Sequence, residues 1–157
     1  MRTTAKVDYA VRAALELARA HPTDGSRPKP VTRQHLAEAQ QIPSKFLEHI
    51  LADLRRGGLV ASVRGTDGGY WLQRSPDDVS MADIIRAVEG PLADVRGQRP
   101  ESLDYPNDLA ALQRAWIALR ANLRGVLEHV SLADLRDNEL HEDLEALASL
   151  DDAWQAR

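Results

Sequence analysis

The chain has no cysteine among its 157 residues. Disulfides, zinc–thiolate sites and a cysteine nucleophile are therefore excluded. Aromatic residues are scarce as well, with one Phe, three Trp and three Tyr. The core must then be built from Ala, Leu, Val and Ile, a mixture that favours helices.

Long apolar runs are also missing. No stretch approaches the roughly 20 residues that a membrane span needs, and residues 1–6 lack the apolar segment of a signal peptide. Histidines occur at positions 21, 35, 49, 129 and 141 without any short metal-binding spacing. We expect a cytoplasmic protein with no membrane partner, no metal, no cofactor and no catalytic residue.

Charge is divided unevenly along the chain. Residues 1–75 hold 12 Lys and Arg against 7 Asp and Glu, a net of +5, whereas residues 76–157 hold 8 against 17, a net of −9. This division indicates one surface that faces a polyanion and another that avoids it. Chance unevenness would explain the same split, so charge alone does not decide the function.

The first half of the chain has helical periodicity. Apolar residues at helical spacing predict a helix over residues 3–20, and a loop rich in Pro and Gly follows over residues 22–30. Thr32 is a suitable N-cap for a helix over residues 33–40, and Pro43 suits the opening of a helix over residues 44–56. The buried stripe expected on this last helix is Phe46, Leu47, Ile50, Leu51 and Leu54.

The period then changes to that of strands. Residues 59–64 alternate, residues 65–69 form a glycine-rich turn, and residues 70–73 alternate again, which predicts a β-hairpin. Helix, helix, turn, helix and hairpin is the order of a winged helix-turn-helix domain. The expected fold class is therefore mainly α with a small β-hairpin wing.

A further helix should begin at Ser80, whose side chain forms a capping box with Asp83, and should end before Gly90. Residues 91–106 lack periodicity and read as a linker loop. We expect three parts: a winged domain over residues 1–90, this linker, and a dimerisation helix with a helical tail over residues 107–157.

The helix expected over residues 107–130 has apolar residues at alternating intervals of three and four. This heptad pattern predicts a helix that packs against a second copy of itself, although packing on its own domain would use the same pattern. The expected dimerisation residues are Leu109, Leu112, Trp116, Leu119, Leu123, Val126 and Val130.

Three segments in the correct order resemble one family of regulators. Residues 57–70, Gly-Gly-Leu-Val-Ala-Ser-Val-Arg-Gly-Thr-Asp-Gly-Gly-Tyr, are similar to its wing, residues 42–48 to the start of its recognition helix, and residues 83–90 to the helix after the wing. This is the family of IscR, NsrR and CymR, also called the BadM or Rrf-two family. The resemblance implies a homodimer whose long helices cross and whose two winged domains face a pseudo-palindromic operator.

The chain departs from the iron–sulfur members of that family. Those members carry three cysteines in the loop before the long helix, whereas residues 91–108 contain none. Asp8 lies where some members offer a carboxylate ligand, but one carboxylate without thiolates would not hold a cluster. We interpret Asp8 as a solvated or capping acid and the chain as a cluster-free member.

DNA recognition needs cations for phosphate and polar groups for base edges. Lys45 can donate to guanine or phosphate, Glu48 can accept from cytosine, and Arg64 on a tight turn suits the minor groove. Ser44 can cap its helix and reach phosphate, and the start of the first helix, Lys6 included, can hold phosphate. The expected DNA-binding residues are Pro43, Ser44, Lys45, Glu48, Arg64, Gly65, Thr66, Gly68, Gly69, Arg2 and Thr4.

Each of these residues also has an ordinary structural interpretation, such as an exposed ion pair for Lys45 and Glu48 or hairpin packing for Trp71. The leading hypothesis is a transcriptional regulator, a repressor that binds double-stranded DNA as a homodimer. Two alternatives stay open. One is a module that docks a partner protein, and the other is a sensor with a small-molecule pocket between the winged domain and the long helix.

Overall fold

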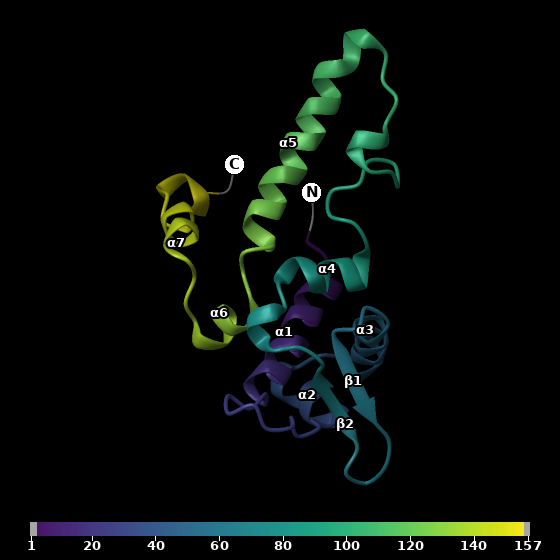
Figure 1. Ribbon diagram of the computed structural model, residues 1–157, viewed down its shortest axis with the longest axis vertical. Helices are drawn as coiled ribbons and strands as arrows, with labels where there is room; N and C mark the ends of the chain where they lie inside the picture. The colour runs from purple at the N-terminus through teal and green to yellow at the C-terminus, as the bar shows by residue number, and fades with distance from the viewer. Residues whose placement is uncertain (1–2, 156–157) are drawn as a thin grey trace.

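The computed structural model describes residues 3–155, and its helices begin and end close to the predicted positions. Figure 1 shows a helical domain with a two-stranded hairpin at one end and a long helix leaving it at the other. The elements are α1 (Ala5–Arg19), α2 (Arg33–Gln40), α3 (Ser44–Arg56), β1 (Val60–Val63), β2 (Gly69–Leu72), α4 (Met81–Glu89), α5 (Ala110–Leu127), α6 (Leu132–Asp137) and α7 (Glu142–Ala148). The predicted fold class, mainly α with a hairpin wing, is confirmed.

Side-chain caps fix where the helices begin. The Thr32 hydroxyl accepts the His35 N–H at 3.1 Å at the start of α2, and Ser80 forms the predicted capping box with Asp83 at the start of α4. Such caps contribute about 1 kcal/mol each because they satisfy N–H groups that the helix leaves unpaired. Gln41 then turns the chain between α2 and α3 in the left-handed region, with φ 51°.

The hairpin pairs β1 with β2 in antiparallel register, from Val60 opposite Leu72 to Val63 opposite Gly69. The segment before α2 extends this sheet, because Val31 and Tyr70 exchange two backbone hydrogen bonds of 2.8 Å. The chain between α1 and α2 is thereby tied to the base of the hairpin.

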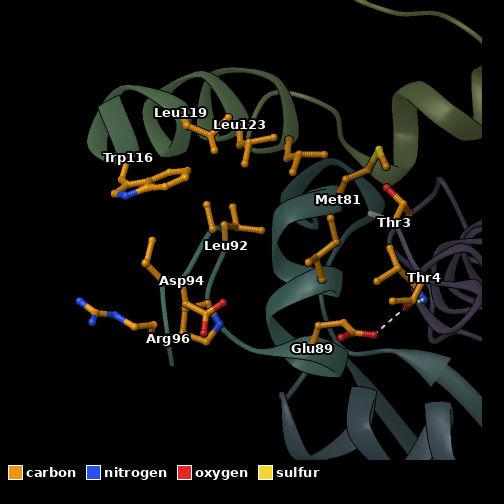
Figure 2. Close-up of a pocket in the computed structure, with 16 residues that line it drawn as sticks. Thr3, Thr4, Met81, Glu89, Leu92, Asp94, Arg96, Trp116, Leu119 and Leu123 are labelled. Carbon is orange, nitrogen blue, oxygen red and sulfur yellow. Dashed lines mark hydrogen bonds between the residues drawn. The ribbon is translucent and has the colours of Figure 1, made fainter. Parts of the chain in front are cut away.

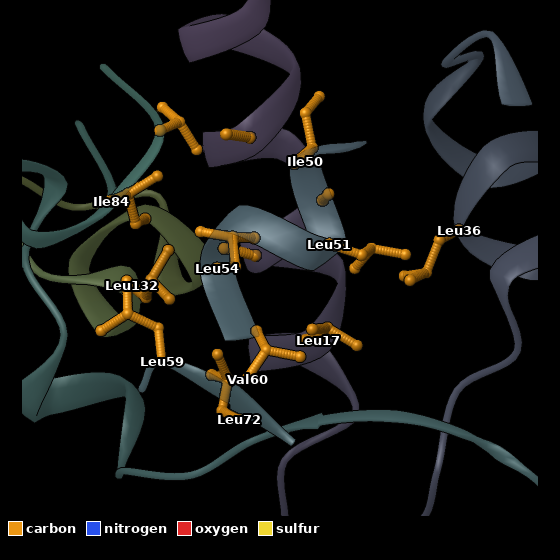
Figure 3. Packing of buried hydrophobic residues seen from close by; sticks show 14 of the residues in the cluster. Leu17, Leu36, Ile50, Leu51, Leu54, Leu59, Val60, Leu72, Ile84 and Leu132 are labelled. Atoms are coloured by element: carbon orange, nitrogen blue, oxygen red, sulfur yellow. The ribbon is translucent and has the colours of Figure 1, made fainter. Parts of the chain in front are cut away.

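The core lies between α1, α3, α4 and the inner face of the hairpin (Figure 3). Leu51, Leu54 and Leu72 are almost completely buried there, and each such side chain contributes about 1.5–3 kcal/mol. Leu132 of α6 is buried in the same cluster. The core of the winged domain therefore includes a residue that follows the long helix in sequence.

Two predictions about packing are wrong. Phe46 was expected in the buried stripe of α3, but it is 50% exposed. It lies near the start of the helix, where its ring packs edge-on against Tyr9 with 6.1 Å between the ring centres. Val130 was expected at the end of the dimerisation helix, but α5 ends at Leu127. Val130 is 4% exposed, and its carbonyl accepts the Met81 N–H at 2.9 Å.

α5 stands apart from the domain and has no fully buried residue. Leu109, Leu112 and Leu119 of the predicted seam are exposed. Within residues 3–155, no helix combines the length and the apolar character that crossing a bilayer would require. Much of the apolar stripe of α5 is thus exposed to solvent within residues 3–155 of one protomer.

Candidate nucleic-acid interface

The tight turn between α2 and α3 sets the position of the predicted recognition helix. The Ile42 N–H donates to the Ala37 carbonyl at 3.0 Å, and Ile42 is buried. Pro43 occupies the N-cap position of α3 without a side-chain cap. The expectation that Ser44 caps the helix is therefore wrong: Ser44 is the first helical residue, and both it and Pro43 are exposed.

A partly buried cluster of polar side chains around Glu16 joins α1 to α2. The Glu16 carboxylate accepts from Gln40 at 2.8 Å, lies 3.1 Å from Arg19 and lies 3.4 Å from the His35 ring. Burial raises the pKa of Glu16, but the hydrogen bonds from Gln40, Arg19 and His35 together outweigh it and leave the pKa below its ordinary value. The charged form of Glu16 therefore stabilises the α1–α2 contact.

α3 presents Lys45 and Glu48 to solvent on its outer side. Glu48 forms an ion pair with Arg33 at the start of α2, with 3.3 Å between the guanidinium and the carboxylate. Sequence reasoning missed Arg33 as a candidate contact, although Thr32 marked it as the first residue of a helix. Phe46 adds an exposed apolar side chain beside Lys45, and such a side chain can contact a thymine methyl group.

The hairpin turn presents Arg64, Gly65 and Thr66 to solvent. Gly65 has φ +118°, a conformation that other residues rarely adopt. Gly68 and Gly69 lack positive φ. A Cβ on Gly69 would lie 2.5 Å from the Val31 carbonyl oxygen, so the close approach at Gly69 is to the chain's own backbone.

Trp71 lies on the hairpin opposite Ala61. The Arg27 guanidinium sits 6.0 Å from the centre of the Trp71 ring, a favourable cation–π distance. Trp71 therefore fastens the loop of residues 22–30 to the hairpin, in agreement with a packing role.

The start of α1 lies at the other end of the domain, beside α4 and α5 (Figure 1). Thr4 caps α1, and its hydroxyl donates to Glu89 at 2.7 Å. The Lys6 ammonium lies 2.8 Å from Asp53 and donates to the Val88 carbonyl at 2.5 Å. The structure does not bring Thr4 or Lys6 together with Lys45 and Arg64, and both polar groups are occupied within the chain. Arg2 lies outside the described residues.

The loop of residues 91–106 does not fit a cysteine-ligated cluster, because it contains no thiol. Among residues 3–155, no group of three His, Asp or Glu side chains lies close enough to hold a metal ion. The Asp8 carboxylate is solvated and pairs with Arg12 at 3.3 Å, as the sequence interpretation expects.

A hollow separates the predicted dimerisation helix from the winged domain. It has a volume of about 630 Å³, and Figure 2 shows Trp116, Leu119 and Leu123 of α5 across from Leu92 and α4. We call this space the α5 hollow; its apolar lining includes Val7, Ile85, Leu92, Trp116, Leu119 and Leu123. Three of the seven residues of the predicted seam therefore face this apolar hollow.

Comparison with protein families gives a match over residues 3–138 to the Rrf2 model, described as an iron-dependent transcriptional regulator. A Mycobacterium tuberculosis protein named for the helix-turn-helix class of regulators is 45% identical over 94% of this chain and 89% of its own length. CymR of Bacillus subtilis, an HTH-type transcriptional regulator, is 32% identical over 86% of this chain and 89% of its own.

Two solved structures show the same architecture. The structure of CymR, the global cysteine regulator of B. subtilis, superposes with a TM-score of 0.70 at 30% identity, over 88% of this chain and 98% of that one. IscR of T. potens gives a TM-score of 0.64 at 31% identity, over 100% of this chain and 93% of that one. Both likenesses include the winged domain and the long helix.

Proposed function

This chain belongs to the Rrf2 family of transcriptional regulators, and from that membership we propose that it binds a pseudo-palindromic operator as a homodimer and represses transcription by covering a promoter. Relatives named as helix-turn-helix regulators match most of this chain, which supports DNA binding and not an enzyme activity. Because its target is DNA, we place the protein in the cytoplasm.

One observation carries the proposal. Two exposed cations, Lys45 and Arg64, sit on two elements that pack against each other, α3 and the hairpin. A helix of this kind enters the major groove with its first residues forward, and an Arg on a tight hairpin suits the narrow minor groove. Lys45 and Arg64 would therefore reach two adjacent grooves of one duplex.

The side chains fall into two groups, those that would contact phosphates and position the protein, and those that would contact base edges and select the sequence. Arg33 and the uncapped start of α3 would hold phosphates, because backbone N–H groups and guanidinium groups both favour them. Glu48 and Phe46 would contact base edges, Glu48 through cytosine and Phe46 through thymine methyl groups. Arg33 and Glu48 are paired at 3.3 Å in the free chain. Contacts with DNA would therefore either break this ion pair or add a DNA group as a second partner to one of its two side chains.

The proposal of a dimer rests on α5. Its exposed apolar stripe would be covered by α5 of a second copy, because the same surface of both subunits meets in an isologous dimer. In a dimer the two winged domains are linked, so binding of one domain raises the effective concentration of the other at the second half-site. A dimer therefore binds a palindrome far more tightly than one domain does.

The test is selection of bound sites from random DNA with the purified full chain. We expect a two-fold symmetric motif, and an asymmetric motif or no enrichment would contradict the proposal. Lys45→Ala and Arg64→Ala should then each weaken binding to the selected site, and each lost phosphate contact should reduce the slope of log K against log salt by about 0.9.

The matched control is Arg136→Ala. It removes one positive charge from α6, which Figure 1 shows on the other side of the domain from α3. Affinity and salt slope should stay at the unsubstituted values in this control. Equal losses for all three variants would point to net charge and not to the α3–hairpin surface.

A further inference from the structure

A polar groove lies between the last turns of α3 and the hairpin. It has a volume of about 490 Å³, and its lining includes Ala52, Arg55 and Arg56 of α3, Ser62 of β1 and Gln73 just after β2. Among the described residues, two arginines and no Asp or Glu line this space. We call it the α3–β1 groove. A groove lined by charge of one sign attracts a ligand of the opposite sign, so this one suits an anion.

The donors of the α3–β1 groove are only partly used within the chain. Arg56 forms an ion pair with Asp53, an acid that also pairs with Lys6 at 2.8 Å. Arg55 is exposed and has no ion-pair partner among residues 3–155. The Ser62 hydroxyl, on the β1 side of the groove, has no hydrogen-bond partner in that same part of the chain. A cation and a hydroxyl are therefore free to donate to a ligand.

The walls of the α3–β1 groove are held in place without Arg55. The side-chain amide of Gln73 donates to the Val60 carbonyl at 3.0 Å, and its backbone N–H donates to the Leu59 carbonyl at 3.0 Å. The Leu59 N–H donates in turn to the Leu54 carbonyl at 3.0 Å, which ties the start of the hairpin to the last turn of α3. The spacing between α3 and β1 is thus set before a ligand binds, which lowers the cost of binding.

The α3–β1 groove continues the face of α3 that carries Lys45. Lys45, Ala52 and Arg56 follow one another at intervals of seven and four residues, which places them on one side of a helix. Arg55 lies ten residues after Lys45, a distance of ~15 Å along the helix axis. The major groove is about 8.5 Å deep. With the first turn of α3 at the base edges, its last turn would lie at the level of the phosphates.

The hairpin places the same groove between the two proposed base contacts. β1 leads from the α3–β1 groove to the hairpin turn, with Ser62 two residues before Arg64, a step of ~7 Å. Figure 1 shows α3 beside the hairpin, whose turn extends away from the core. One sugar–phosphate strand separates a major groove from the adjacent minor groove. A duplex that receives Lys45 in one groove and Arg64 in the next must therefore pass that strand between α3 and the hairpin turn.

We therefore propose that the α3–β1 groove holds the sugar–phosphate strand that separates the two grooves of each operator half-site. The Arg55 guanidinium and the Ser62 hydroxyl donate to phosphate oxygens, and Arg56 adds positive charge while Asp53 remains its partner. These contacts carry no sequence information, because every operator has the same phosphates. They fix the position of α3 relative to the hairpin turn on the duplex. The proposal rests on the operator binding proposed above.

Uncharged phosphates test this contact directly. In the operator selected from random DNA, the phosphates of one half-site are replaced one at a time by methylphosphonates. The base positions whose preference weakens in Lys45→Ala and in Arg64→Ala mark the two grooves. We expect the full chain to lose affinity about tenfold, the equivalent of one hydrogen bond to a charged group, at one or two phosphates between those positions.

The Arg55→Ala variant identifies the protein side of the contact. Its affinity for the unmodified operator should fall by about the same tenfold, and the sensitive methylphosphonates should then cause little further loss, because the two changes remove one interaction. The slope of log K against log salt should fall by about 0.9. Ser62→Ala should weaken binding less and leave this slope unchanged, because the hydroxyl carries no charge.

Controls separate a phosphate contact from a role of Arg55 in helix stability. A cation at the end of α3 also stabilises the helix, but a loss from fraying would add to that of the methylphosphonate instead of replacing it. The loss in Lys45→Ala should add in that way. Site selection with Arg55→Ala should return the motif of the unsubstituted chain. Arg136→Ala removes one charge elsewhere and should change neither affinity nor slope.

The outcomes separate the two proposals. If the unsubstituted chain selects no symmetric site, operator binding and the phosphate contact in the α3–β1 groove both fail. If it selects such a site, and Lys45→Ala and Arg64→Ala weaken binding, the operator proposal stands. The α3–β1 groove proposal alone is then overturned if Arg55→Ala keeps its affinity and salt slope, or if its loss adds fully to that of every methylphosphonate.

Discussion

Lys6 and Asp53 form an ion pair of 2.8 Å that ties α1 to α3. The same ammonium donates to the Val88 carbonyl near the end of α4, so one side chain joins three helices. The Asp53 side chain is largely buried and also receives Arg56. The helix proposed to read DNA is therefore positioned from behind by a residue that sequence analysis placed among the phosphate contacts.

Replacement of Lys6 by Met should destabilise the fold by about 2 kcal/mol. The change leaves Asp53 buried beside a single partner, and breaking a buried pair costs about 3–5 kcal/mol. A smaller value applies because the Lys6 side chain is one-third exposed, at 33%. Urea unfolding followed by circular dichroism measures the effect.

Asp8→Asn is the matched control. It breaks the exposed pair between Asp8 and Arg12 on the same helix, which should cost less than about 0.5 kcal/mol. Equal losses in Lys6→Met and Asp8→Asn would show that the Lys6 pair has no special structural role.

Two glycines should respond to alanine in opposite ways. In Gly69→Ala the new Cβ would lie 2.5 Å from the Val31 backbone, so we expect a loss of about 1–3 kcal/mol from overpacking and weaker operator binding. In Gly125→Ala, inside α5, nothing lies within 4 Å of the new atom. A gain of about 0.5–1 kcal/mol is expected there, and thermal unfolding of both variants checks the contrast.

The Glu16 cluster should make stability depend on acid pH. The folded-state pKa of Glu16 is below its ordinary value of 4.5. Its contribution to the free energy of unfolding is therefore fully present above pH 4.5 and is lost as the pH falls through the folded-state pKa. Glu16→Gln should lower stability by up to about 1 kcal/mol at pH 7 and by less near pH 3. A constant difference across that range would show that the carboxylate charge is not what holds α2.

The apolar stripe of α5 should decide the oligomeric state. Leu119→Glu combined with Leu123→Glu places two carboxylates on the stripe, so we expect monomers in sedimentation equilibrium and at least a hundredfold weaker operator binding. Ala121→Glu, on the opposite face of the helix, should change neither property. A double variant that still sediments as a dimer would place the interface elsewhere.

Local patterns in the sequence were sufficient for most of the fold. Thr32, Pro43 and Ser80 marked helix starts because capping depends on residues within one turn. The change of period after Gly58 marked the hairpin for a similar reason. The order of these segments suggested the resemblance to the family, and the match over residues 3–138 confirms it.

Local sequence patterns could not predict the contacts between residues far apart in the chain. Nothing near Lys6 in the sequence indicates Asp53 or Val88, and nothing near Thr4 indicates Glu89, because these partners lie more than 40 residues away. Phe46 and Val130 fitted helical stripes by spacing, but burial depends on where the neighbouring helices stop. The sequence suggested Glu48 as a candidate contact on α3, whereas its ion pair with Arg33 depends on how α2 packs against α3.

The way in which the segment that holds α5 leaves the winged domain and rejoins it has a consequence for operator architecture. The chain leaves the winged domain after α4 and re-enters it at Val130 and Ser131, which are hydrogen-bonded to Met81 and bridged to Ser80. Such a double attachment allows little swivelling between the two halves of a symmetric assembly. One inserted base pair displaces a half-site by ~3.4 Å and turns it by ~34° around the duplex. Promoters that differ by that single step in spacing should therefore fall outside the regulon.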